Sequence, residues 1–404
     1  MKRHAKLISL LLALIIFAGI LAGCGSSDYA MTANGEKYSA KPYAFYAYWY
    51  RDLWNTNVYM YTGSDDLTSK LSTAISNDGK TLKQYIIEQT ESQYIDYIII
   101  EQKFKELGLS FTDEIKKQTD YEFQHNFIES YTEDKLNNIY KTLGLTADEI
   151  KDILEINYKR QMIIDHYFGE GGEKEISEET IKNSFTNDYA RFKYIAFAKT
   201  DDSGNNLSTD KTLEKYNTVK DIINQLNSGA NFEELIKKYS EAYVSNTDGY
   251  SDDKKKAAED LNEVLTIDGL IIGKNGTILQ DYTYGRASSV LDSSLVNKIF
   301  ALNNNEYSYV ETDTGYWILK RCDINEEERF YDNCRDAVYN NLLSEPYTEL
   351  FESWKKDFTY TMNEKVVEKY SPDKISALFF DKDSFKTSTD GSTDTNNDST
   401  TSEK

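Results

Sequence analysis

The side chains that most often carry out chemistry are scarce in this sequence. Its 404 residues contain three histidines and three cysteines. They are His4, His125, His166, Cys24, Cys322 and Cys334. Three cysteines are too few for a disulfide scaffold or a thiolate zinc site. No histidine follows Tyr167, which leaves little scope for histidine-based catalysis.

Two polar motifs contain the residue types of a metal site without the full pattern. His125 and Glu129 are four residues apart in a predicted helix, so they form either half of a metal site or a solvated helix face, and we favour the second. The segment from Asp201 to Asp210 is rich in oxygen ligands but lacks the glycine and the terminal glutamate of a calcium-binding loop. We therefore predict no metal and no cofactor.

Cys322 and Cys334 are separated by eleven residues, at the end of a predicted strand and inside a predicted helix. Outside the cell such a pair can form a disulfide, but spacing alone does not supply the geometry that a disulfide needs. The sequence is therefore compatible with a disulfide between Cys322 and Cys334 and with two unpaired thiols.

The charge of the chain argues against one large class of partners. Asp and Glu number 68 against 46 Lys and Arg, a net charge of −22. So acidic a chain repels phosphate backbones, and we expect no nucleic-acid binding. With only 20 Gly and 3 Pro, the composition favours long helices. The 32 Tyr and 18 Phe provide rings that bury large areas.

The amino terminus has the pattern of an export signal. A cationic stretch, Met1 to Lys6, precedes an almost unbroken apolar run from Leu7 to Ile20. The next residues, Leu21-Ala-Gly-Cys24, resemble the lipobox of bacterial lipoproteins. The resemblance implies that Cys24 becomes a lipid-modified amino terminus, which holds the protein on the outer face of the cell membrane. An uncleaved signal anchor is the alternative.

Helical periodicity dominates the residues that follow. Apolar residues recur at spacings of three and four, and the longest run, Thr81 to Leu107, contains no glycine or proline. Thr146 and Glu149 have the spacing of a capping box. The predicted helices are 42–61, 81–107, 112–143, 146–168 and 177–189.

From Arg191 the periodicity changes. Phe192 to Ala198 and Gly315 to Arg321 are predicted strands, and we assign no element within 240–285. Pro346 predicts a kink or break in the last helix. The predicted helices of this half are 213–227, 232–239, 293–301 and 326–356.

The order of these elements, with several motifs, resembles the extracytoplasmic foldases of the PrsA and SurA type. Asn34-Gly-Glu-Lys37 before an aromatic helix is similar to the start of their chaperone region, and Glu101 to Glu114 to its helix junction. Other segments are similar to a parvulin-type (PpiC) peptidyl-prolyl isomerase domain. They are Gly229 to Ser240, Phe300-Ala-Leu with Asn305-Glu-Tyr-Ser308, and Thr312 to Lys320.

The resemblance implies an α+β fold. A mostly helical chaperone domain of the SurA and trigger-factor kind, made of the amino-terminal helices and the long carboxyl-terminal helix, would contain an inserted parvulin-like α/β domain. The predicted ranges are 1–23 signal peptide, 24–32 tether, 33–189 helical chaperone domain, 190–323 parvulin-like domain, 324–380 carboxyl-terminal helix completing the chaperone domain, and 381–404 disordered tail.

The catalytic pattern of the isomerase family is not retained. Tyr194 and Trp317 occupy the two positions where the family has histidines. The proline pocket is better preserved, because Leu291, Leu295 and Phe300 match apolar positions of the family. Prolyl isomerisation depends on desolvating and twisting the amide, not on a nucleophile. The parvulin-like domain is therefore expected to be either a slow isomerase or a degenerate module that only binds clients.

We expect a lipid-anchored foldase that captures unfolded or newly exported polypeptides, with homodimerisation open. Some tyrosines of the amino-terminal helices should line a groove for these clients, and most should belong to the core. The alternatives are a solute-binding lipoprotein of a transporter, which would have two lobes of alternating strands and helices, and a passive envelope scaffold. A helical circular-dichroism signal from residues 33–185 would separate the foldase from the solute-binding protein.

Overall fold

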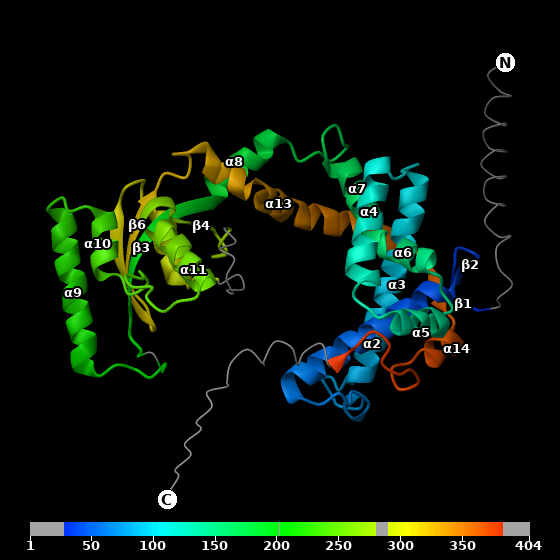
Figure 1. Cartoon of the computed structure of the whole chain (residues 1–404). Coiled ribbons are helices and arrows are strands. Elements are labelled where there is room, and N and C mark those ends of the chain that lie inside the picture. Colours follow the sequence, from blue (N-terminus) through cyan, green and yellow to red (C-terminus); the bar gives the residue numbers. More distant parts are fainter. Residues whose placement is uncertain (1–27, 202, 280–289, 383–404) are drawn as a thin grey trace, which may run out of the picture. The chain divides into compact units, whose positions relative to one another are not determined.

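The computed structural model describes residues 28–201, 203–279 and 290–382, and the chain separates into two compact units (Figure 1). The first unit contains the residues up to Ile164 and those from Leu350 onward, and the second runs from Asp165 to Glu349. The predicted signal peptide, Cys24 and residues 383–404 of the predicted tail lie outside the described residues. In the described part of the chain, no helix is long and apolar enough to cross a membrane.

A small antiparallel sheet joins the two ends of the first unit. Its strand order is β2 (Glu36–Ser39), β1 (Tyr29–Ala33), β7 (Tyr360–Met362). Asn34 and Gly35 connect β1 to β2 with φ angles of 53° and 81°, the left-handed geometry that favours this dipeptide in a hairpin. Ala30 and Met31 are fully buried in β1. Residues 30 and 31 of the predicted tether, 24–32, therefore pair and pack in this sheet, and the range of the tether stays a prediction.

Helices make up most of the first unit. They are α2 (Ala40–Thr62), α3 (Leu82–Glu106), α4 (Asp113–Phe123), α5 (Glu133–Leu143), α6 (Ala147–Leu154), α7 (Ile156–Phe168, which continues into the second unit) and α14 (Glu364–Lys369), with a short 3-10 turn at Thr68–Lys70. The predicted capping box is confirmed, because the Thr146 hydroxyl accepts from the Glu149 amide at 3.2 Å and the Glu149 carboxylate accepts from the Thr146 amide at 2.9 Å.

The single helix predicted over 112–143 was wrong. Helix α4 ends at Phe123 and is followed by a π-helical turn, Gln124–Ile128. Helix α5 then begins after Thr132, whose hydroxyl accepts from the Lys135 amide at 3.3 Å. The threonine is the preferred kind of residue for a helix start, and its capping bond competes with continuation of the preceding helix.

One buried carboxylate fixes the carboxyl-terminal segment to α2. Asp52 is 3% exposed. It accepts hydrogen bonds from three successive backbone amides, those of Leu378, Phe379 and Phe380, at 2.7, 2.6 and 3.4 Å. Arg51 pairs with Asp52 at 3.1 Å and donates to the carbonyl of Ile375 at 2.9 Å. The buried Asp52 carboxylate is stable here because three backbone amides donate to it and the Arg51 guanidinium balances its charge.

The second unit is built on one antiparallel sheet. Its order is β4 (Leu270–Gly273), β3 (Tyr189–Ala198), β6 (Gly315–Cys322), β5 (Tyr307–Glu311). Its helices are α8 (Glu178–Asp188), α9 (Thr209–Asn227), α10 (Phe232–Tyr239), α11 (Asp252–Glu263), α12 (Ser293–Ala301) and α13 (Glu328–Asp357, which continues into the first unit), with a π-helical turn at Val264–Asp268. Helices α9 and α10 pack on one face of the sheet, where Ile222 and Ile236 meet Ile195 and Ile318.

The strand predictions for β3 and β6 are confirmed, although β3 begins three residues earlier than predicted. Helix α13 continues through Pro346, so the predicted break is absent there. Within 240–285, where no element was predicted, the structure contains α11 and β4. Helix α11 was hard to predict because it has one buried residue, Ala258.

The α+β fold class is confirmed, since both sheets are antiparallel and lie among helices.

The two compact units begin and end at other residues than the predicted domains do. The predicted domain ranges stay a prediction. Helix α8 was grouped with the helical chaperone domain, but Phe185 in α8 packs on Tyr331 in α13, with ring centroids 5.4 Å apart. Both rings belong to one buried cluster of the second unit.

The disulfide alternative is not realised. Cys322 and Cys334 are both unpaired and buried. Burial raises the pKa of the Cys334 thiol to about 11, so this thiol stays protonated and unreactive at neutral pH.

We expect Asp52→Asn to lower the free energy of unfolding of the first unit by about 2–4 kcal/mol, because it removes the charge from three hydrogen bonds and leaves Arg51 buried without its counter-ion. Urea unfolding followed by tryptophan fluorescence would measure this. The exposed Asp66 also accepts a backbone amide, from Ser69 at 3.2 Å, and Asp66→Asn should change stability by less than about 0.5 kcal/mol. Equal effects of the two substitutions would contradict a special role for Asp52.

Candidate functional site

The sheet of the second unit brings together the two residues that replace the family histidines. Tyr194 in β3 is opposite Leu319, and Trp317 in β6 is opposite Ala196, so both side chains lie on the same face. Their ring centroids are 5.2 Å apart, with 49° between the planes. Two aromatic rings in contact therefore fill the positions that would hold two imidazoles.

The residues predicted to form the proline pocket lie on this same face. Leu295 in α12 is 3% exposed and belongs to a cluster with Phe192 and Leu319 of the sheet. Leu291 and Phe300 are partly buried and pack against that cluster, as do Tyr194 and Trp317. Tyr194, Trp317, Leu291, Leu295 and Phe300 therefore belong to one cluster on one sheet face, which we call the α12 face.

The α12 face has few polar groups. The indole nitrogen of Trp317 is buried and has no hydrogen-bond partner among the described residues. The guanidinium of Arg321 lies over the Phe300 ring at 5.5 Å, and burial lowers its pKa. One guanidinium nitrogen of Arg321 is also buried without a partner in the described part of the chain. An apolar surface with these two N–H donors can hold an uncharged ring and donate to a carbonyl oxygen, but it offers no group that changes protonation near neutral pH.

The first unit has a separate aromatic cavity between α2, α4 and α6. Its volume is about 210 Å³. The lining consists of Trp49, Phe123, Phe127, Leu154 and Tyr158, with polar side chains from Thr119, Glu122, Asn126, Lys151 and Glu155. Trp49 is 42% exposed, a large exposed fraction for so large an apolar side chain. We call this cavity the aromatic groove.

The rings of the aromatic groove are held by other rings. Trp49 stacks on Phe45 with centroids 5.9 Å apart and contacts Phe379 at 5.7 Å. Phe123 stacks on Phe127 with centroids 5.3 Å apart and 11° between the planes. Phe379 is one of the three residues whose amides donate to Asp52, so the carboxyl-terminal segment supports one wall of the groove.

The polar rim of the aromatic groove is internally satisfied. Thr119 donates to Glu155 at 2.8 Å, and Lys151 pairs with Glu155 at 3.5 Å. A hydrogen bond from Tyr158 lowers the pKa of Glu122, which therefore stays ionised at neutral pH. Each of these charged groups has a partner within the protein, so the groove offers a ligand mainly aromatic area.

Few tyrosines of the amino-terminal helices are fully buried. Tyr43, Tyr46 and Tyr94 are 1%, 6% and 0% exposed, and the other described tyrosines of these helices are half-buried or exposed, so the prediction that most belong to the core was too broad. One tyrosine of these helices, Tyr158, lines the groove, together with Trp49, Phe123 and Phe127, which the sequence analysis did not single out. The sequence did contain one indication of this lining. Phe123 and Phe127 are four residues apart, and residues at that spacing share a helix face.

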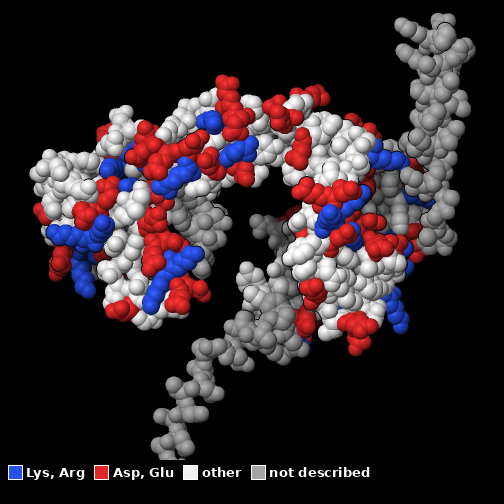
Figure 2. Space-filling model, turned by 45° about the horizontal axis from the view of Figure 1, so that its top comes forward, with Lys and Arg blue, Asp and Glu red and all other residues white. Residues whose placement is uncertain are grey.

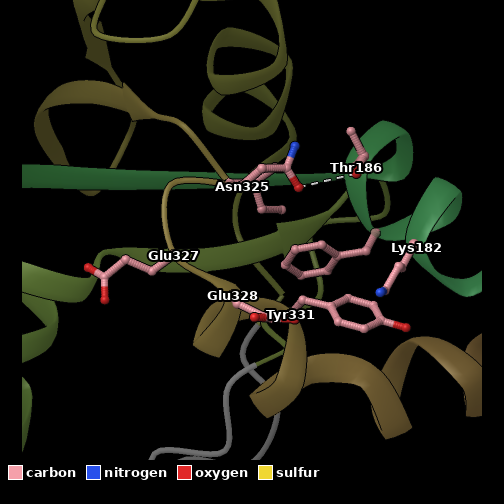
Figure 3. Close-up of a pocket in the computed structure, with 8 residues that line it drawn as sticks. Lys182, Thr186, Asn325, Glu327, Glu328 and Tyr331 are labelled. Carbon is pink, nitrogen blue, oxygen red and sulfur yellow. Dashed lines mark hydrogen bonds between the residues drawn. The ribbon is translucent and has the colours of Figure 1, made fainter.

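A third cavity, of about 230 Å³, lies between α8 and the start of α13 (Figure 3). Thr186 donates to Asn325 at 3.3 Å across it, as the dashed line in Figure 3 marks. The Lys182 ammonium lies 5.3 Å from the Tyr331 ring centroid. Burial and the hydrogen bond to Glu178 raise the pKa of Tyr331 to about 12. Thr186 and Asn325 bond to each other and Tyr331 bonds to Glu178, and we propose no ligand for this cavity.

The two candidate metal motifs have ordinary surroundings. The His125 ring stacks on Tyr121 at 3.9 Å, and its Nδ1 lies 2.9 Å from the Tyr121 carbonyl oxygen. The Asp201 carboxylate accepts from the amides of Ser203 and Asn205, which closes a local turn. Within the residues that the structure describes, no three His, Cys, Asp or Glu side chains gather closely enough to hold a metal ion. Acidic groups are spread over the face drawn in Figure 2.

Comparison with known proteins gives limited similarity. No family model matches the chain, and no curated protein matches it. Among solved structures, the chain is similar to PrsA from Bacillus subtilis, with 16% identity over 70% of this chain and 91% of that one and a TM-score of 0.22. It is also similar to the foldase protein PrsA from Streptococcus pneumoniae, with 17% identity over 67% and 85% and a TM-score of 0.29. The TM-scores are low, so the proposals below rest on the residues and geometry of this chain.

We expect residues 25–404 to accelerate prolyl isomerisation only weakly, because Tyr194 and Trp317 supply a phenol and an indole in place of imidazoles. The pocket should still bind proline-containing peptides. Phe300→Ala should weaken that binding about fivefold through loss of apolar contact. Val290→Ala, at a neighbouring side chain that is 66% exposed, should not. A protease-coupled peptide assay and fluorescence anisotropy would measure the two quantities. Strong acceleration that Phe300→Ala abolishes would contradict the expectation.

Proposed function

We propose that this protein is a lipid-anchored foldase that holds unfolded or newly exported polypeptides on the outer face of the cell membrane. The observation that carries the proposal is the aromatic groove of the first unit, with the 42% exposed Trp49 at its edge. Rigid aromatic side chains give large contact area at a small cost in side-chain entropy, whatever the sequence of the bound segment. Weak binding to many segments follows from such a surface.

The rim of the groove supports low specificity. Glu155 pairs with Lys151, and Glu122 accepts hydrogen bonds from Gln118 and Tyr158, so no unpaired buried charge selects one ligand. A segment rich in aromatic or aliphatic side chains gains apolar burial on entering, and a polar segment gains little. Unfolded chains expose the first kind of segment, whereas folded proteins bury it.

The second unit contributes a second binding surface under this proposal. Tyr194, Trp317, Leu295 and Phe300 on the α12 face form an apolar site of the kind that receives a prolyl ring. We propose that this unit is a parvulin-like module that binds client segments and has lost most of its catalysis. The absence of imidazole at both positions supports that view.

The architecture favours this proposal over a solute-binding lipoprotein. The described residues form sheets of three and four antiparallel strands, whereas a two-lobed solute-binding protein would have alternating strands and helices around parallel strands. A passive scaffold would have no need of an exposed aromatic cavity.

We expect Trp49→Ala and Phe123→Ala each to reduce suppression of client aggregation about tenfold, because each removes a large part of the groove lining. Light scattering of a reduced, unfolded client at increasing concentrations of residues 25–404 would measure the effect. Tyr61→Ala is the matched control, since Tyr61 is an aromatic residue of α2 that is 90% exposed and outside the groove. Circular dichroism would verify that each variant is folded. Failure of the unsubstituted protein to suppress aggregation would overturn the proposal.

The anchor can be tested separately. Expressed in a Gram-positive bacterium from its full 404-residue sequence, the protein should incorporate labelled palmitate and sediment with membranes. Cys24→Ser should abolish both, because the thiol is the proposed acceptor of the lipid. Cys322→Ser should change neither, since Cys322 is buried in the second unit. Palmitate incorporation that persists in Cys24→Ser would contradict the assignment.

A further inference from the structure

The sheet of the second unit has an edge strand, β5. It pairs with β6 on one side, and no described strand pairs with its other side. An unpaired edge presents a row of backbone donors and acceptors that another extended chain can use. Natural proteins commonly blunt such edges with Pro or Lys, and β5, with sequence YSYVE, contains neither.

The register fixes which residues of β5 point outward. The Thr312 amide donates to the Gly315 carbonyl at 2.9 Å, and the Arg321 amide donates to the Glu306 carbonyl at 2.9 Å. Hydrogen bonding alternates along an antiparallel strand, so Ser308 and Val310 also bond to β6. Tyr307, Tyr309 and Glu311 therefore turn their backbone N–H and C=O groups away from the sheet.

A groove runs beside this edge, between β5 and α9. Its volume is about 460 Å³, the largest of the cavities described above and within the range of about 300–1,000 Å³ typical of ligand sites. The helix lines it with Tyr216, Val219, Lys220, Ile223, Asn224 and Asn227, and the strand lines it with Tyr307, Ser308 and Tyr309. Apolar and aromatic side chains thus lie next to the outward backbone groups.

The walls of this groove are held in place. Tyr307 donates to Asn227 at 2.8 Å, which ties the strand to the end of the helix. Tyr309 stacks on Tyr316 with centroids 6.3 Å apart, and Tyr216 contacts Tyr316 at 5.8 Å. A preformed groove between an edge strand and a helix lowers the entropy lost when an extended peptide binds.

We propose that the β5 edge and the groove beside α9 bind an extended segment of a client polypeptide by strand addition, an inference that rests on the proposed foldase function. The segment would pair with the backbone of Tyr307, Tyr309 and Glu311, and its alternate side chains would enter the groove. This surface is distinct from the α12 face. Tyr307 and Tyr309 pack with Ile195 and Ile318 on one side of the sheet, whereas Trp317 packs with Leu295 on the other.

Charge indicates the kind of segment. Lys220 is the one charged side chain among the described lining residues, and its ammonium lies 4.2 Å from the Tyr216 ring centroid. The groove therefore favours apolar side chains at alternate positions. The net charge of −22 attracts basic flanking residues and opposes close approach of a second copy through this edge.

The test separates the backbone of β5 from its side chains. Glu311→Pro removes an outward N–H donor, and an outward position is where an edge strand accepts proline without losing a bond to its neighbour. Glu311→Ala is the matched control, because both variants lose the Glu311 carboxylate and its ion pair with Lys199 at 2.7 Å. The probe is a fluorescent peptide of alternating Val and Thr with two lysines at each end, and anisotropy reports its binding to residues 25–404.

We expect Glu311→Pro to weaken peptide binding at least fivefold relative to Glu311→Ala, and a peptide with glutamate flanks to bind more weakly than the lysine peptide. Hydrogen exchange at residues 305–312 should slow when the lysine peptide is added to the unsubstituted protein. Equal affinities of the two variants, with both folded by circular dichroism, would overturn strand addition. A dimer in sedimentation that Glu311→Pro dissociates would assign the edge to a second copy and would also overturn the proposal.

Failure of this inference is distinguishable from failure of the proposed function. If Trp49→Ala reduces suppression of aggregation while Glu311→Pro and Glu311→Ala bind the peptide equally, the foldase proposal stands and strand addition is wrong. If the unsubstituted protein neither suppresses aggregation nor binds the peptide, both are wrong.

Discussion

The first unit depends on the burial of one ionised side chain. Asp52 accepts three successive backbone amides of the carboxyl-terminal segment, and Arg51 compensates its charge while binding a fourth backbone group. Removing a carboxylate from water costs several kcal/mol, so this arrangement is stable only when all of these partners are present together. The same contacts bring Phe379 against Trp49 and Phe45. The position of an exposed ring in the aromatic groove therefore depends on a polar cluster in the interior of the unit.

In the second unit the corresponding constraint is strand register. Side chains alternate along a strand, so one register assigns Tyr194 and Trp317 to one face and Ile195, Tyr309 and Ile318 to the other. A slip of one residue would exchange the two faces. The eight residues of β6 therefore contribute alternately to two surfaces, one on the side of the sheet that packs against α12 and one on the side that packs against α9.

The sequence predicted those features that depend on local chemistry. The capping box at Thr146 and the strand over 192–198 both follow from short-range patterns. Features that depend on contacts between distant residues were missed. Strand β7 has three residues and no strong periodicity, and it forms only because β1 lies beside it. The sequence also contains no indication that Asp52 binds the carboxyl-terminal segment. Its partners are backbone amides more than 300 residues away, and a backbone amide is present whatever the residue type.

The sheet of the first unit has a consequence for the order of folding. Strand β1 at residues 29–33 pairs with β7 at residues 360–362, and the buried Met31 lies opposite Met362. The second unit, by contrast, is one continuous stretch from Asp165 to Glu349. If the protein is exported with its amino terminus first, as proposed, the second unit can be completed while the first still lacks its last strand. The helices that precede Asp165 would then keep apolar surface uncovered until nearly the whole chain has crossed the membrane.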